Sequence, residues 1–192
     1  MKKKLTYILA SLAFLSIGAI DDTESLGKMT PSFVYTSNLQ DSTTNESLSN
    51  RLKPIKENFK RINTITNWTA IDTKSLWESL EGGEIKYYYQ NENLEKIITK
   101  HYGEMFQQLT EYYILNGQLS FVYTKHYKYY ETFGLENSQI FENRSYFENG
   151  NLIYQINNPD KDTPFKGYLI EYVNSLKASF EKYVAGKDLY EL

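Results

Sequence analysis

The stretch YYYQNENLEKIITKHY at residues 87–102 returns as YYILNGQLSFVYTKHY at residues 112–127, with the same residue at eight of the sixteen positions. A third, partial copy near Tyr146 shares a tyrosine, an Asn-Gly pair and a leucine. The Asn-Gly pairs at 116–117 and 149–150 are typical of two-residue hairpin turns, because a type I′ turn needs positive φ at both central positions. Each copy is therefore predicted to form one β-hairpin. Glycine is missing from Asn91-Glu92, so we expect a looser or longer turn there.

These hairpins decide the fold class, since an isolated hairpin cannot bury its apolar face and must pair with its neighbours. Apolar residues recur at helical spacing before the hairpins, from Leu48 to Ile62, and after them, from Leu169 to Val184. The sequence predicts an α+β domain. It consists of an antiparallel β-meander of about six or seven strands built from hairpin repeats, with an N-terminal and a C-terminal helix packed on it. We expect two layers, with both helices on one face of the sheet.

Proline and threonine predict where these helices begin. Pro54 is tolerated in the first helical turn, where backbone N–H groups have no intrahelical acceptor, so the first helix should start near Ser49 or Asn50. Thr163 is the expected N-cap of the second helix, with Pro164 at its first position.

The N-terminus is predicted to be a signal peptide, residues 1–19. Lys2, Lys3 and Lys4 precede an uncharged run of sixteen residues, 5–20, and small residues offer a cleavage site after Gly18 or Ala19. The alternative is a permanent anchor, but the run is shorter than the roughly 20 residues that span a bilayer. We therefore expect an exported protein, periplasmic or secreted by a bacterium, with no stable membrane anchor after cleavage.

Composition sets further limits. Residues 20–49 are rich in Ser, Thr, Asn and Asp, which predicts a polar tether ahead of a single domain at 50–192. The chain has no cysteine, which excludes disulfides and thiolate chemistry. Its formal net charge is −3, and removing three lysines with the signal peptide makes it −6, so a nucleic-acid partner is not expected.

Tyrosine, at 18 of 192 residues, suggests a binding surface. Its ring is apolar and its hydroxyl polar, which suits contacts with proteins, peptides or glycans. The alternative is structural, because tyrosine also favours strands and stabilises cross-strand pairs. The candidate binding residues, expected on an exposed aromatic face, are Tyr87, Tyr89, Tyr112, Tyr123 and Tyr127.

Two further sets of residues were considered for catalysis or metal binding. His101 and His126 occupy equivalent repeat positions, but an intervening strand would place them about 10 Å apart, too far to share one zinc ion. Glu78, Glu81 and Glu84 surround a Gly-Gly turn and could act as paired carboxylates, but the favoured interpretation is a solvated acidic turn. We predict no metal site and no cofactor, and the catalytic residues of any activity stay unknown.

The segments EGGE (81–84), YYY (87–89), EYYILNGQLSFVY (111–123) and ENRSYFENGNLIYQI (142–156) resemble a group of exported proteins of uncharacterised function from Bacteroidetes-type bacteria. That resemblance implies an envelope or secreted location and a similar fold. Many members are lipoproteins, whereas this chain has no cysteine to acylate. The Tyr-Tyr-x-x-Asn-Gly-x-Leu phrase is also similar to MORN-type hairpin repeats, without their second glycine-rich turn.

The leading functional interpretation is an exported, non-catalytic interaction module that binds a protein, peptide or glycan. One alternative is an envelope-acting hydrolase that uses carboxylates or a histidine on the sheet. Another is a structural or assembly protein, which an exposed edge strand would favour.

Overall fold

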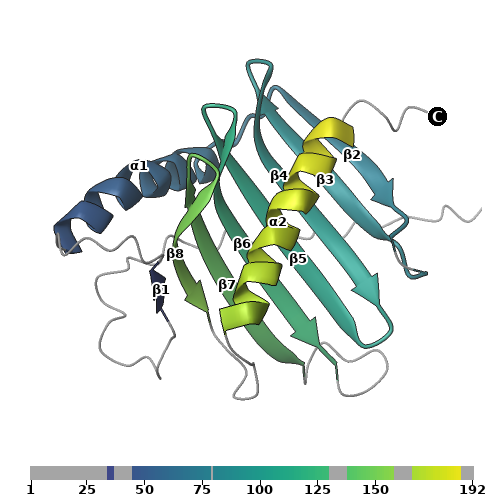
Figure 1. Cartoon of the computed structure of the whole chain (residues 1–192). Coiled ribbons are helices and arrows are strands. Elements are labelled where there is room, and N and C mark those ends of the chain that lie inside the picture. The colour runs from purple at the N-terminus through teal and green to yellow at the C-terminus, as the bar shows by residue number, and fades with distance from the viewer. Residues whose placement is uncertain (1–33, 37–44, 79, 130–137, 158–165, 187–192) are drawn as a thin grey trace, which may run out of the picture.

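The computed structural model of the chain describes residues 34–36, 45–78, 80–129, 138–157 and 166–186 (Figure 1). The elements are β1 (Val34–Thr36), α1 (Asn45–Asn63), β2 (Ala70–Leu76), β3 (Gly83–Gln90), β4 (Asn93–Gly103), β5 (Phe106–Leu115), β6 (Gln118–Lys128), β7 (Gln139–Glu148), β8 (Asn151–Asn157) and α2 (Lys166–Gly186). Strands β2 to β8 pair antiparallel in chain order, which confirms the α+β meander with one helix before it and one after it. β1 adds to the outer side of β8.

The hairpin turns follow the prediction at two of three sites and correct it at the third. Asn116 and Gly117 have φ values of 53° and 75°, and the Asn149-Gly150 turn has nearly the same pair. The Asn91-Glu92 turn was expected to be looser or longer, and this is wrong, because its φ values are 49° and 69°. The paired strands impose the same tight turn on Glu92 despite its Cβ.

Each hairpin also carries a β-bulge just after its turn. The strand register shifts at Tyr88/Tyr89, at Tyr113/Ile114 and at Tyr146/Phe147. The residues left without a direct partner are Glu95, Ser120 and Ile153. A bulge bends its strand and increases the local twist, so three bulges at one end of neighbouring hairpins curve the whole sheet.

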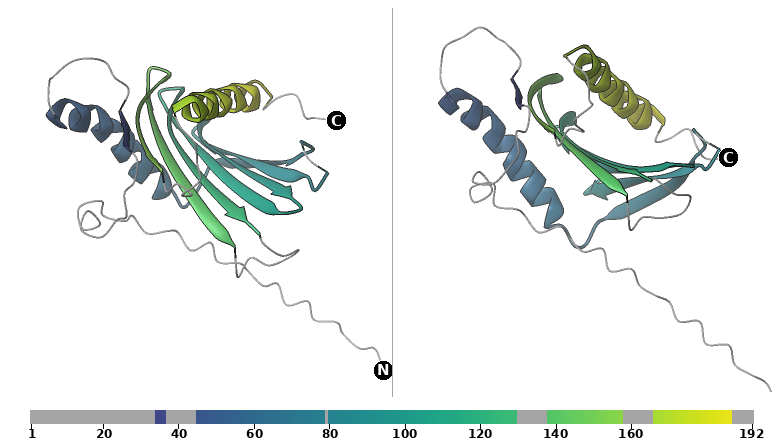
Figure 2. Two further views of the ribbon diagram at one scale, coloured as in Figure 1. Left: turned by 60° about the horizontal axis from the view of Figure 1, so that its bottom comes forward. Right: turned by 90° about the horizontal axis from the view of Figure 1, so that it is seen from below.

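The curved sheet is covered on both faces, so the expected two-layer arrangement is wrong. Figure 2 shows α2 inside the concave face and α1 on the convex side. Tyr112 packs in the cluster under α2, whereas the next residue, Tyr113, packs in the cluster under α1. Successive strand residues point to opposite faces, so the tyrosine doublets supply an aromatic core to each helix.

The first helix begins earlier than expected. α1 begins at Asn45, so Pro54 lies inside the helix. Pro54 is exposed, as is Asn50, and solvent can therefore reach the carbonyl that proline leaves without a donor. β1 brings part of the segment predicted as a tether into the sheet. The signal peptide, Thr163 and Pro164 lie outside the described residues.

In the described part of the chain, neither helix combines the length and apolar character needed to cross a membrane.

Candidate interaction surface

The five candidate tyrosines do not share one exposed face. Tyr87 and Tyr112 are 1% and 3% exposed on the concave side, where Tyr89 also packs against the core under α2. Their assignment to an exposed aromatic face is wrong, because α2 covers the face on which they lie. Tyr123 and Tyr127 lie on the convex side and are only partly buried, so a binding role stays a prediction for these two.

On the convex side, α1 packs over Tyr113, Phe121 and Tyr146 at the bulged end of the hairpins. Apart from Tyr88, Gln90 and Lys96 at the bulged end, the rest of this face on β3 to β7 consists of side chains none of which is buried. We call it the open face, and its residues are Glu84, Lys86, Ile98, Lys100, Tyr102, Gln107, Leu109, Glu111, Tyr123, Lys125, Tyr127, Ile140, Glu142 and Arg144.

Two ion clusters organise the open face on either side of the central strand β5. Glu142 accepts a hydrogen bond of 2.6 Å from the Tyr123 hydroxyl, and lies 3.4 Å from Arg144 and 3.9 Å from Lys125. Glu84 lies 3.2 Å from Lys86 and 4.0 Å from Lys100.

The strand register places Leu109 between Lys100 and Lys125. The open face therefore has an apolar centre between two clusters that limit side-chain freedom.

Aromatic rings on this face are held in place by cations. Lys125 Nζ is 5.0 Å from the centre of the Tyr127 ring, and the Arg144 guanidinium is 5.5 Å from the Tyr123 ring. Burial raises the pKa of Tyr123, and the hydrogen bond to Glu142 raises it further, so the hydroxyl stays protonated and donates. Rings fixed before binding lose less entropy when a partner docks on them.

The two histidines lie on the concave face with β5 between their strands, since both are paired with Gln108. His101 Nε2 is 3.3 Å from the Tyr183 hydroxyl and its Nδ1 is 3.7 Å from Glu78. Glu78 also pairs with Lys182 at 2.6 Å. These contacts attach α2 to the sheet. Burial lowers the pKa of His101, an effect that Glu78 partly offsets.

His126 lies apart from this group and stacks on Phe106 with ring centres 5.4 Å apart. Glu78, Glu81 and Glu84 are not brought together: Glu78 contacts α2, Glu84 lies on the convex side, and Glu81 is exposed. Across the described residues there is no group of three or more His, Asp or Glu side chains placed to hold a metal ion.

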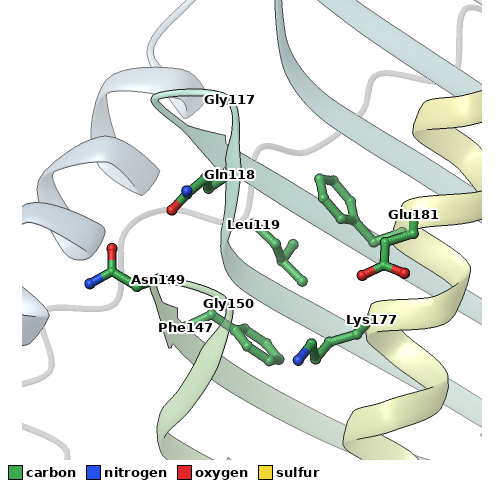
Figure 3. Close-up of a pocket in the computed structure, with 9 residues that line it drawn as sticks. Gly117, Gln118, Leu119, Phe147, Asn149, Gly150, Lys177 and Glu181 are labelled. Atoms are coloured by element: carbon green, nitrogen blue, oxygen red, sulfur yellow. The ribbon is translucent and has the colours of Figure 1, made fainter.

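A pocket of about 250 Å³ lies between two hairpin turns and α2 (Figure 3). Leu119, Phe147 and Phe180 provide apolar lining, while Lys177 and Glu181 add charge from one side of the helix. Lys177 and Glu181 are four residues apart on α2, a spacing that places both on the same face of the helix. The glutamates and histidines considered for catalysis do not line this pocket.

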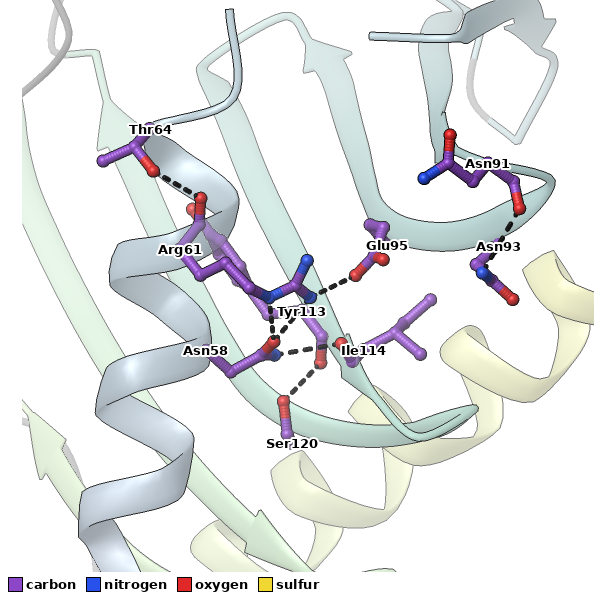
Figure 4. A network of polar contacts seen from close by, with 9 residues as sticks. All are labelled: Asn58, Arg61, Thr64, Asn91, Asn93, Glu95, Tyr113, Ile114 and Ser120. Atoms are coloured by element: carbon purple, nitrogen blue, oxygen red, sulfur yellow. Dashed lines mark hydrogen bonds and ion pairs between the residues drawn. The ribbon is translucent and has the colours of Figure 1, made fainter.

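Sequence reasoning also missed the polar contacts that hold α1 to the sheet (Figure 4). The buried Asn58 amide donates to the carbonyl of Ile114, a residue at the second bulge, over 2.9 Å. Arg61 donates to Asn58 and forms an ion pair with Glu95, the bulged residue of the first hairpin. These contacts fix which part of the convex side α1 covers. They therefore set the limit of the open face.

The ion clusters of the open face were missed as well, although a signal was present. Opposite charges two residues apart in a strand, as at Glu84/Lys86 and Glu142/Arg144, share a face.

No protein-family profile matches the chain, and comparison with curated proteins and with solved structures finds no match.

Proposed function

We propose that this protein is an exported, non-catalytic binding module that holds a protein partner on its open face. The observation that carries the proposal is the arrangement of that face, with fixed tyrosines and charges around a partly exposed apolar centre at Leu109. Exposed Tyr102 and Ile140, at 36% and 41%, extend the apolar surface toward one end of the strands. Tyrosine and arginine are enriched at protein interfaces, whereas a convex sheet surface does not enclose a small substrate.

Export is the second part of the proposal. The lysine-led apolar segment at the N-terminus and the resemblance to exported proteins support it. We therefore look for the partner in the cell envelope and the culture fluid.

The test is a crosslinking pull-down with the full chain, carrying a C-terminal tag and expressed in the cells that produce it. The variant Leu109→Glu places a charge at the centre of the open face, directly opposite Lys100 and Lys125, so the fold should tolerate it. The matched control is Ile170→Glu on α2, where the side chain is 57% exposed and far from the open face.

Wild type and Ile170→Glu should recover the same protein near stoichiometry, and Leu109→Glu should lose it. Equal recovery with Leu109→Glu would place the binding surface elsewhere. Recovery of no specific protein by any of the three chains would reject a protein partner and turn attention to glycans. Mass spectrometry of the purified chain should also show an N-terminus after Gly18 or Ala19, and an intact residue 1 would contradict export by signal-peptide cleavage.

A further inference from the structure

The two edges of the sheet differ. At one edge β1 pairs with β8 over Val34, Tyr35 and Thr36. At the other edge, within the part of the chain that the structure describes, β2 pairs with β3 alone. An edge strand presents backbone N–H and C=O groups that can pair with another strand. β2 therefore offers a further strand the backbone groups that point away from β3, on alternate residues of its seven.

Large apolar side chains are exposed along this same edge. Ile71 in β2 is 48% exposed, and Trp77 and Leu80, which follow the strand, are 84% and 100% exposed. They include the two most exposed large apolar side chains in the described part of the chain. Large apolar side chains exposed in and just after an available edge strand favour an interaction there.

The charges on β2 indicate which strand can pair with it. Asp72 and Lys74 are placed symmetrically about Thr73, and both lie on the concave side, where Lys74 Nζ is 5.6 Å from the centre of the Tyr87 ring. In an antiparallel pair of two identical strands centred on Thr73, each Asp72 stands directly opposite the Lys74 of the other strand. A pair centred on residue 72 would oppose two aspartates, and one centred on 74 would oppose two lysines.

We propose that the partner strand is β2 of a second copy of this chain, paired antiparallel in the register centred on Thr73. Two Asp72–Lys74 pairs then form between the copies, and Ile71 stands opposite Ser75 on the convex side. Residues that face each other across a strand pair share a face of the sheet. The two concave faces therefore continue into one another, and both open faces stay on the other side.

The same charges disfavour other occupants of this edge. An uncharged strand would place no charge opposite Asp72 or Lys74, whereas the strand's own sequence places the opposite charge at each position. Charge patterns that accept one register and reject its neighbours are a general route to specific strand pairing.

The first test uses the absence of cysteine from the full chain. Thr73→Cys places two cysteines opposite each other across the proposed axis, where Cα atoms about 4.5–5.5 Å apart suit a disulfide. The matched control is Ser75→Cys, on the same face, whose copies would lie about 13 Å apart along the strands. Mild oxidation should give covalent dimers of Thr73→Cys and leave Ser75→Cys monomeric. Equal crosslinking of both, or of neither, overturns the register.

The second test measures the dimer without a crosslink, by sedimentation equilibrium of the full chain over a range of concentrations. The wild type should be in monomer–dimer equilibrium. Asp72→Lys opposes lysines at both pairs and should weaken the dimer about tenfold or more. The exchange Asp72→Lys with Lys74→Asp restores opposite charges and should recover the affinity. The proposal is overturned if the wild type is monomeric at every concentration. It is also overturned if the double variant melts at the same temperature as the wild type but fails to recover the dimer. None of these substitutions alters the open face, so the result is independent of the partner search above.

Discussion

Glu92 is the one non-glycine residue at the second position of the three turns in the hairpin repeats. Its φ of 69° matches the 75° and 74° of Gly117 and Gly150 at the equivalent positions. A residue with a Cβ in this left-handed region costs about 1–2 kcal/mol. Replacing Glu92 with glycine removes this strain, but it also raises the conformational entropy of the unfolded chain, which offsets roughly 0.5–1 kcal/mol of the gain. Glu92 is exposed, so its side chain contributes little packing. Glu92→Gly should therefore stabilise the fold by about 0.5–1 kcal/mol.

The assay is urea unfolding followed by tryptophan fluorescence, with thermal melting as a second readout. A gain of this size corresponds to roughly 1–4 °C in Tm for a chain of this length, with an unchanged dependence of the unfolding free energy on urea. Two controls separate backbone strain from charge. Glu92→Ala removes the carboxylate but keeps the Cβ, so it should leave stability nearly unchanged. Gly117→Ala meets no heavy atom within 4 Å, so strain alone should lower its stability by about 1 kcal/mol.

The reasoning would be refuted if Glu92→Ala gave the same gain as Glu92→Gly, because the effect would then belong to the negative charge. It would also fail if Gly117→Ala cost nothing, since the left-handed turn would then tolerate a Cβ.

Two other predictions rest on buried polar groups. Asn58→Ala should destabilise the fold by about 1–3 kcal/mol in urea unfolding, because it removes the donor that lies 2.9 Å from the Ile114 carbonyl. A loss under about 0.5 kcal/mol would contradict the role of Asn58 in attaching α1 to the sheet. Burial lowers the pKa of His101 and His126 below the ordinary 6.5. Below about pH 6.5 the unfolded chain therefore binds more protons than the folded chain does. The stability of the fold is complete, with respect to these two groups, above about pH 6.5 and decreases as the pH falls below it. His126→Gln should make the urea midpoint less sensitive to pH between about 6.5 and 5, and an unchanged pH profile would contradict this.

Local signals with a direct backbone cause were readable from the sequence. The Asn-Gly pairs at 116–117 and 149–150 demand positive φ, and they marked two hairpins and hence the meander. The helices were readable from apolar spacing. The start of α1 was not, because the expected start relied on Pro54 alone, and an exposed proline can sit inside a helix when solvent satisfies the freed carbonyl.

The assignment of faces could not be read from the sequence. In an ordinary half-buried strand, polar residues alternate with apolar ones and identify the solvent side. In this chain Tyr112 and Tyr113 are both buried, one under each helix. The tyrosine doublets therefore have the same polarity on both faces and do not identify a solvent side. The bulges added to the difficulty, because each inserts one residue and reverses the alternation partway along a strand.

The repeat predicts the face of a residue but not its surroundings, and the two histidines show why. His101 and His126 point to the same face, as the register requires. α2 crosses the strands diagonally, so its C-terminal part brings Tyr183 to His101, whereas His126 lies beside Phe106 and Phe141 (Figure 1). A duplicated hairpin thus provides equivalent positions, and an element outside the repeat makes them different. Lys100 and Lys125, in contrast, both have an acidic neighbour on the open face, but from different hairpins. Glu84 lies in the first strand of the hairpin that contains Lys100, whereas Glu142 lies in the first strand of the hairpin that follows Lys125.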